Sequence, residues 1–271
     1  MDLEKLRNKY LNSGYTMANA LAKICQDIIL SKIAKSSFKN NITIKGGVVM
    51  HNISKNKRRA TRDLDIDFIK YSLNNDSINN FIKKLNNTDN DIKIIVDDIS
   101  ELQHQDYKGK RVKLKIIDKN NFAIYTKLDI GVHKLFDINQ DEYCFNLEAI
   151  DESVTLFINS KEQIIGEKLK SLLKLGIIST RFKDIFDFYY LINYTNLNKD
   201  ELLKVLQKII ISDKSMKENN IEDIVKRLKD IFSDKRFISN LDDAKNNWLE
   251  IPAEIVVENI LNYFSTLQYI S

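Results

Sequence analysis

The sequence predicts an α+β protein, with a small mixed sheet in its N-terminal half and only helices in its C-terminal half. Short segments between residues 41 and 132 alternate apolar and polar residues, which is typical of strands. After about residue 150, nearly every segment has the three-to-four spacing of an amphipathic helix. A chain of 271 residues is long enough for two domains. We therefore predict an α/β domain with a leading helix over 1–150 and a helical domain over 151–271.

Composition and charge limit the function classes only broadly. The formal charge is +4, from 42 basic and 38 acidic side chains, which permits a nucleic-acid partner without arguing for one. Cys25 and Cys144 form no CxxC pair, so the sequence suggests neither a disulfide framework nor a zinc site. The N-terminus "MDLEKLRNKY" does not resemble a signal peptide, and no apolar run approaches membrane-spanning length. We expect a cytoplasmic protein without a membrane partner.

The N-terminal half begins with a helix over 14–36, in which Met17, Leu21, Ile24 and Ile28 share one face. A strand over 41–45 then ends at a glycine pair, and residues 48–53 resemble a helical turn or two. The remaining elements expected here are a strand over 63–70, a helix over 75–86 and strands over 91–96, 111–117 and 122–132.

The C-terminal half shows clear helix boundaries. Ser160 followed by Gln163 is a capping-box pattern, and Gly176 can end the helix that starts there. Further helices are expected over 181–194, 199–212, 217–232 and 253–267.

Aspartates alternate with apolar residues in the strand over 63–70. Asp63, Asp65 and Asp67 therefore project from one face, where like charges repel and need a neutralising partner. Asp129 lies on the polar face of the strand over 122–132. Two carboxylates from one strand and a third from a neighbouring strand form an oxygen ligand set suited to Mg²⁺. The alternative is the solvated polar face of an edge strand.

We predict Asp63, Asp65 and Asp129 as the metal ligands, on the condition that their strands are adjacent. The stretch "DLDID" also offers a second register, in which Asp65 and Asp67 form the metal pair. Dispersed His51, His104 and His133 show no ligand spacing.

Glycines and basic residues precede these carboxylates. Gly46 and Gly47 lie between a strand and a helical turn, where backbone N–H groups can approach a phosphate. A basic run separates the glycines from the aspartates and consists of Lys55, Lys57, Arg58, Arg59 and Arg62. Alone it would be a solvated loop, but its position makes contact with phosphate the favoured interpretation.

The segment "KGGVVMHNISKNKRRATRDLDIDF", residues 45–68, resembles the first motif of polymerase-β-like nucleotidyltransferases. More specifically, it is similar to the AbiEii/AbiGii group of toxins, which have a glycine pair followed by R-x-T-x-D-L-D. Arg59, Thr61, Asp63, Leu64 and Asp65 match that pattern. The match also favours Asp63 with Asp65 as the metal pair, since Arg59 and Thr61 then align.

A second segment, "EKLKSLLKLGIISTRFKDIFDFYYL", resembles the E-K-L helix of the same family and its following R-x-K-D-x-x-D. The matching residues are Glu167, Lys168, Leu169, Arg181, Lys183, Asp184 and Asp187. Lys168 lies within an apolar helical stripe, so it must snorkel or find a phosphate or carboxylate partner. The motif favours nucleotide phosphates for Lys168 and a catalytic role for Asp184. Asp187 can equally be structural, pairing with Lys183 or Arg181 on a surface.

The resemblance implies a polymerase-β-like fold and a Mg²⁺-dependent nucleotidyltransferase toxin, completed by the helical domain. Such an enzyme transfers a nucleoside monophosphate from an NTP to an acceptor, here expected to be the 3′ end of tRNA, and releases pyrophosphate. The implied catalytic residues are Asp63, Asp65, Asp129, Lys168 and Asp184, and the implied nucleotide-binding residues are Gly46, Gly47, Arg59, Thr61 and Lys168.

The same resemblance implies a type IV toxin–antitoxin or abortive-infection system, whose antitoxin need not bind the toxin. Two alternatives stay open. One is a nucleotidyltransferase that modifies a small molecule such as an aminoglycoside. The other is a non-catalytic relative that binds RNA or protein and has vestigial carboxylates.

Overall fold

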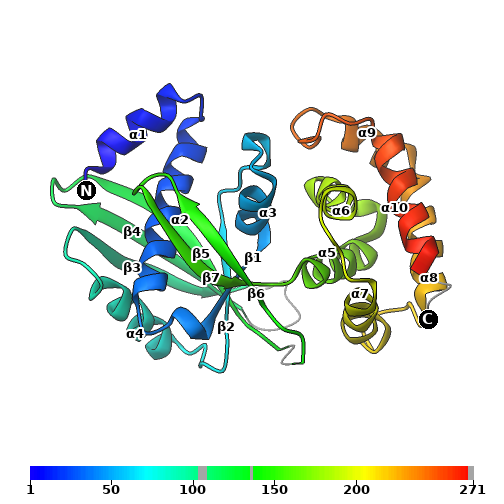
Figure 1. The fold of residues 1–271 in the computed structure, drawn as a ribbon, viewed down its shortest axis with the longest axis horizontal. Helices are drawn as coiled ribbons and strands as arrows, with labels where there is room; N and C mark the ends of the chain where they lie inside the picture. Colours follow the sequence, from blue (N-terminus) through cyan, green and yellow to red (C-terminus); the bar gives the residue numbers. More distant parts are fainter. Residues whose placement is uncertain (103–108, 135–136, 268–271) are drawn as a thin grey trace. The chain divides into compact units, whose positions relative to one another are not determined.

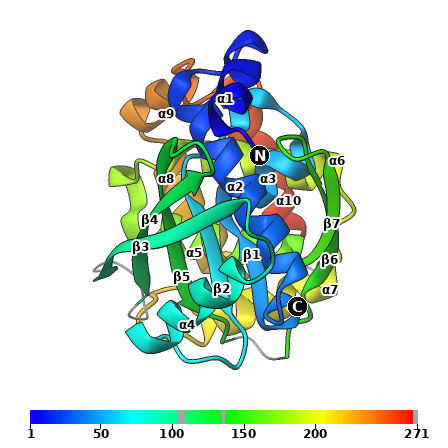
Figure 2. The same ribbon diagram turned by 90° about the vertical axis from the view of Figure 1, so that its left-hand side faces the viewer.

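The computed structural model describes residues 1–102, 109–134 and 137–267. The chain forms two compact units, Met1–Asn159 and Ser160–Ser271 (Figures 1 and 2). The first unit contains a sheet and the second consists of helices, as the sequence predicts for an α+β protein.

The first unit is built on a seven-stranded mixed sheet with the order β3-β4-β5-β2-β1-β7-β6. Its two central strands, β1 and β2, are antiparallel to each other, and each is parallel to its other neighbour, β7 and β5 respectively. The strands are β1 (Ile42–Lys45), β2 (Leu64–Phe68), β3 (Ile92–Glu101), β4 (Lys110–Asp118), β5 (Ala123–Val132), β6 (Asp141–Leu147) and β7 (Glu152–Ile158).

The predictions for β1 to β5 are confirmed, but those for the region after β5 are incomplete. The structure adds β6, and β7 contradicts the expectation of helices alone after residue 150. β7 alternates like a strand, with Leu156 and Ile158 buried, and it pairs with β1, which lies more than a hundred residues earlier. Such long-range parallel pairing leaves no local turn signal in the sequence.

The described residues of this unit form four α-helices: α1 (Leu3–Asn12), α2 (Met17–Lys35), α3 (Gly46–Ser54) and α4 (Asn75–Asn86). The helix expected over 14–36 is confirmed as α2, whose N-cap Thr16 accepts a hydrogen bond from the backbone N–H of Asn19. α1 was not expected. α2 packs against β5 and β7 and also contacts α1 and α4 (Figure 2).

The apolar face of the central strands forms the core of this unit. Ile44, Ile66 and Ile130 lie in one cross-strand row and are completely buried. Because side chains alternate between the faces of a strand, this burial sends the intervening polar residues of β1, β2 and β5 to the opposite face. The core therefore fixes the direction of the aspartates.

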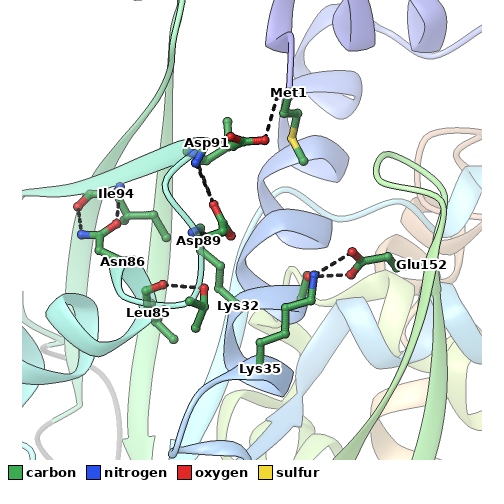
Figure 3. Close-up of polar contacts among 12 residues, drawn as sticks. Met1, Lys32, Lys35, Leu85, Asn86, Asp89, Asp91, Ile94 and Glu152 are labelled. Atoms are coloured by element: carbon green, nitrogen blue, oxygen red, sulfur yellow. Dashed lines mark hydrogen bonds and ion pairs between the residues drawn. The ribbon is translucent and has the colours of Figure 1, made fainter.

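Ion pairs connect α2 to β7 and to the segment between α4 and β3 (Figure 3). The buried Lys32 contacts Asp89 at 2.8 Å, and Lys35 contacts Glu152 on β7 at 2.6 Å. In the same region, the side chain of Asn86 accepts from and donates to the backbone of Ile94, with both hydrogen bonds at 2.8 Å. These contacts attach α4 to β3 and α2 to β7.

The second unit contains α5 (Lys161–Leu175), α6 (Phe182–Tyr194), α7 (Lys199–Leu206), α8 (Ile221–Phe232), α9 (Lys235–Asp242) and α10 (Ala253–Leu267). The boundaries of α5 are as predicted: the hydroxyl of Ser160 accepts from the N–H of Gln163 at 3.1 Å, and Gly176 ends the helix with φ of +58°. A π-helical turn, Gln207–Ile211, follows α7, and α9 was not expected. Among the described residues, none of the helices is sufficiently long and apolar to span a membrane.

Candidate functional site

Four charged side chains form a row across the polar face of the sheet. Lys45 on β1 lies opposite Asp65 on β2, Asp65 lies opposite Asp129 on β5, and Asp129 lies opposite Arg111 on β4. Side chains directly opposite each other on neighbouring strands project to the same face. The row therefore has two adjacent carboxylates in the middle and one cation at each end. We call these residues the charged row.

Arg111 binds the outer carboxylate of the charged row in a bidentate manner. Its Nε and Nη2 donate to the two oxygens of Asp129 at 2.8 and 2.7 Å. The hydrogen-bonded Asp129 carboxylate raises the pKa of the Arg111 guanidinium, although burial acts in the opposite direction. The charges of Asp63 and Asp65 also raise this pKa, so all three predicted metal ligands are close enough to act on Arg111. The condition of adjacent strands is met.

Asp67 is held by the cation at the other end of the row. Its carboxylate contacts the ammonium of Lys45 at 2.7 Å, and only 4% of the Asp67 side chain is exposed. Asp65 is half-buried, and Asp63, immediately before β2, is exposed. In a metal pair of Asp65 with Asp67, Asp67 would have to exchange Lys45 for the metal, just as Asp129 would have to exchange Arg111.

The glycine pair provides space for the residues around the charged row. Gly46 has φ of +70°, and a Cβ atom there would lie 2.2 Å from Oδ2 of Asp65. A Cβ atom on Gly47 would lie 2.7 Å from the hydroxyl oxygen of Thr61. α3 begins at Gly46, so the Asp65 carboxylate lies at the N-terminus of this helix, where the helix dipole favours negative charge. The glycines therefore have a packing role beyond the predicted approach to phosphate.

A Gly46→Ala substitution is expected to destabilise the first unit and displace Asp65. Alanine would have to adopt the left-handed backbone conformation of Gly46, which costs about 1–2 kcal/mol, and its methyl group would collide with the Asp65 carboxylate. Thermal denaturation should show a clearly lower melting temperature. Gly14→Ala is the matched control for backbone conformation, because Gly14 also has positive φ but its Cβ would meet no atom within 4 Å. Equal losses in the two variants would contradict the proposed contact with Asp65.

The basic run between α3 and β2 is not a uniformly solvated loop. Lys57 and Arg58 are exposed, whereas Arg59 is only 4% exposed at the end of a short 3₁₀ helix, Lys57–Arg59. Gln26 on α2 donates to the backbone carbonyl of Thr61 at 3.0 Å and so anchors the segment that leads into β2. A buried guanidinium requires hydrogen-bond or ion-pair partners. Arg59 is therefore held in place within the protein, whereas Lys57 and Arg58 lie on the surface.

The second motif forms a separate cluster of charges within the second unit. Lys168 on α5 contacts the carboxylates of Asp184 and Asp187 on α6, the latter at 2.9 Å. Asp187 is fully buried, so the alternative that placed it on a surface is wrong. Arg181 lies 4.0 Å from Asp184 and is largely exposed. The partner that Lys168 needs in its apolar stripe is thus a pair of carboxylates in this structure.

Surface depressions in the second unit do not coincide with this cluster. The larger, about 620 Å³, lies between α8, α9 and α10 and is lined by residues such as Phe232, Asp242 and Glu254. The other, about 390 Å³, lies beside the π-helical turn and includes Leu203 and Ile211. Neither is lined by Lys168, Asp184 or Asp187.

Sequence analysis missed two residues of the charged row, Arg111 and Lys45. Both were in predicted strands, and the polar alternation of "RVKLKII" is the signal that places Arg111 on the polar face. In the part of the chain that the structure describes, no three His, Cys, Asp or Glu side chains are arranged to hold a metal ion. Arg111 instead provides the positive charge beside Asp129.

Comparison with known families places both motifs in one match. The family model described as the nucleotidyl transferase AbiEii toxin of a type IV toxin–antitoxin system matches residues 28–264. No curated protein matches the chain. The matched segment contains the charged row of the first unit and the Lys168 cluster of the second, and it covers most of the 271 residues. The chain belongs to the AbiEii family of nucleotidyl transferase toxins of type IV toxin–antitoxin systems.

Proposed function

We propose that the chain transfers a nucleoside monophosphate from an NTP to the 3′ end of an RNA, with tRNA as the first candidate, and that the reaction depends on Mg²⁺. The observation that carries this proposal is the charged row, in which Asp65 and Asp129 face each other on adjacent parallel strands. Arg111 provides positive charge beside Asp129 in this structure, and Mg²⁺ would take over this role in the proposed reaction.

The three predicted metal ligands have the chemistry that Mg²⁺ prefers, but among the described residues they are not arranged around a common ion position. Asp63, Asp65 and Asp129 offer only carboxylate oxygens, and the Arg111 guanidinium already shows that this place accepts positive charge. These three aspartates would hold the ion, which would require Asp129 to exchange Arg111 for the metal. When bound, Mg²⁺ would neutralise charge on the nucleotide phosphates.

The residues of the chain would bind the triphosphate and handle the proton. The N-terminus of α3 at Gly46 and Gly47 offers backbone N–H groups to phosphate oxygens, and Arg59 is the proposed cation of this unit. In the reaction, the acceptor hydroxyl oxygen forms a bond to the α-phosphorus, and the bond from that phosphorus to the β-phosphate oxygen breaks. Pyrophosphate leaves, and the hydroxyl proton passes to a carboxylate, for which Asp129 is the candidate in this unit.

Incubation with labelled NTPs tests this proposal and its two alternatives. The purified chain is given each α-labelled NTP with Mg²⁺ and either total tRNA or an aminoglycoside. We expect label on tRNA, loss of labelling when EDTA removes the metal, and no labelling by the Asp63→Asn, Asp65→Asn double variant. Label on the aminoglycoside alone would replace the RNA acceptor by a small molecule. Absence of label on every acceptor would overturn the transferase proposal in favour of a non-catalytic binding protein.

A further inference from the structure

The polar face of β4 and β5 continues beyond the charged row into a group of lysines around a tyrosine. Lys113 lies opposite Lys127, and Lys115 lies opposite Tyr125, in the same uninterrupted register that pairs Arg111 with Asp129. Since residues two apart share a face of a strand, these side chains lie on the face that carries Arg111 and Asp129. We call Lys113, Lys115, Lys127 and Tyr125 the lysine–tyrosine face.

The side chains of this face are accessible. Tyr125 is 67% exposed, and half of the Lys113 side chain is exposed. The ammonium of Lys115 lies 5.8 Å from the centroid of the Tyr125 ring, and Lys127 is exposed. A single exposed aromatic residue is common on protein surfaces and needs no explanation. Here, however, the ring lies among three lysines on regularly paired strands.

The arrangement carries an electrostatic cost that a ligand would remove. Like charges directly opposite each other on neighbouring strands are destabilising, and Lys113 and Lys127 are such a pair. Asp98 on β3 contacts Lys113 at 3.0 Å and offsets part of this charge. The remaining excess is positive and surrounds a flat, exposed ring. A chain of phosphates with unpaired bases matches both features, since its charge suits the lysines and its bases can stack on tyrosine.

The distance from Tyr125 to the charged row also suits single-stranded nucleic acid. Tyr125 is four residues from Asp129 on the same strand, which corresponds to about 13 Å at the usual rise per residue. A nucleic-acid strand whose end lies at the carboxylates therefore reaches Tyr125 with a base that is close to this end.

We propose that the lysine–tyrosine face binds the single-stranded end of the nucleic-acid acceptor. Lys113, Lys115 and Lys127 contact its phosphates, and a base stacks on Tyr125. This inference rests on the proposed function, because it identifies the acceptor of that reaction as single-stranded nucleic acid.

Fluorescence anisotropy with the whole chain and a labelled single-stranded RNA oligonucleotide, without NTP, tests the electrostatic part. Replacing Lys113, Lys115 and Lys127 together by Gln should weaken binding and make the negative slope of log K against log salt shallower by about two, since each phosphate contact on a single strand contributes about 0.7 to its magnitude. The matched control replaces Lys199, Lys226 and Lys229, three exposed lysines of the second unit, by Gln. An equal loss in both triple variants would overturn the proposal, because it would show dependence on net charge alone.

Two substitutions of Tyr125 test the stacking. Tyr125→Ala should weaken binding at least about fivefold, whereas Tyr125→Phe should bind like the wild type because it keeps the ring. Wild-type affinity of Tyr125→Ala would overturn the assignment to unpaired bases. The transfer assay is run in parallel on the same oligonucleotide. Label transfer with affinity that is unchanged in all variants would reject the lysine–tyrosine face and leave the transferase intact. Binding that depends on the face without any label transfer would reject the transferase alone.

Discussion

Lys168→Met is expected to lower the free energy of unfolding by about 3–5 kcal/mol, the cost of breaking a buried ion pair by removing one partner. Methionine keeps the aliphatic stem and fills the apolar stripe of α5, so loss of packing contributes little. The loss is electrostatic, because the ammonium of Lys168 contacts both Asp184 and Asp187. Asp187 is fully buried, and without Lys168 its charge would lose a close cation.

Urea denaturation of three variants separates the effect of losing the Lys168 charge from the effect of changing the side-chain volume. Lys174→Met, an exposed position on the same helix, should change stability by less than about 0.5 kcal/mol. Adding Asp184→Asn and Asp187→Asn to Lys168→Met should recover much of the lost stability, since the stranded charges are removed. A Lys168→Met protein as stable as the wild type would show that the cluster does not stabilise the second unit.

The helices of this chain could be predicted with accurate boundaries where caps and periodicity agree. Residues 75–86 and 253–267 are helical as expected, and Ser160 and Gly176 delimit α5. The short α9 was missed although Asp234 caps it through the N–H of Phe237. A single eight-residue helix offers too few turns for its periodicity to be distinguished from that of a loop.

For the candidate site, the sequence predicts which face of its own strand each residue occupies, but not which strands lie next to each other. Alternation in β2 and β5 assigns Asp63, Asp65 and Asp129 to polar faces, and the structure aligns two of them in register. The ion pairs of the site depend on strand and helix neighbours that no local pattern reveals. Arg111 meets Asp129 only because β4 pairs with β5, and Lys168 meets Asp187 only because α5 contacts α6.

Asp65→Asn is expected to reduce nucleotide transfer by at least about two to three orders of magnitude, the scale for losing one preorganised stabilising contact. Asp65 is at the centre of the charged row, opposite both Asp129 and Lys45. The substitution removes one of the negative charges that act on Arg111 and reduces repulsion between Asp65 and Asp129. Because the lost repulsion offsets the lost attraction to Arg111 and to the N-terminus of α3, the melting temperature without metal should change little, while transfer of labelled nucleotide is lost.

Asp67→Asn is the matched control, because it makes the same chemical change two residues along the same face of β2. Asp67 is buried and paired with Lys45, so this variant should lose stability while the folded fraction retains transfer. The two variants thus have opposite expected profiles, one inactive and stable, the other active and destabilised. The reverse result, with transfer lost in Asp67→Asn and kept in Asp65→Asn, would remove Asp65 from the metal site. Loss of transfer in both variants, with Asp63→Asn still active, would assign the metal to Asp65 and Asp67, and Lys45 would then have to release Asp67 when the metal binds.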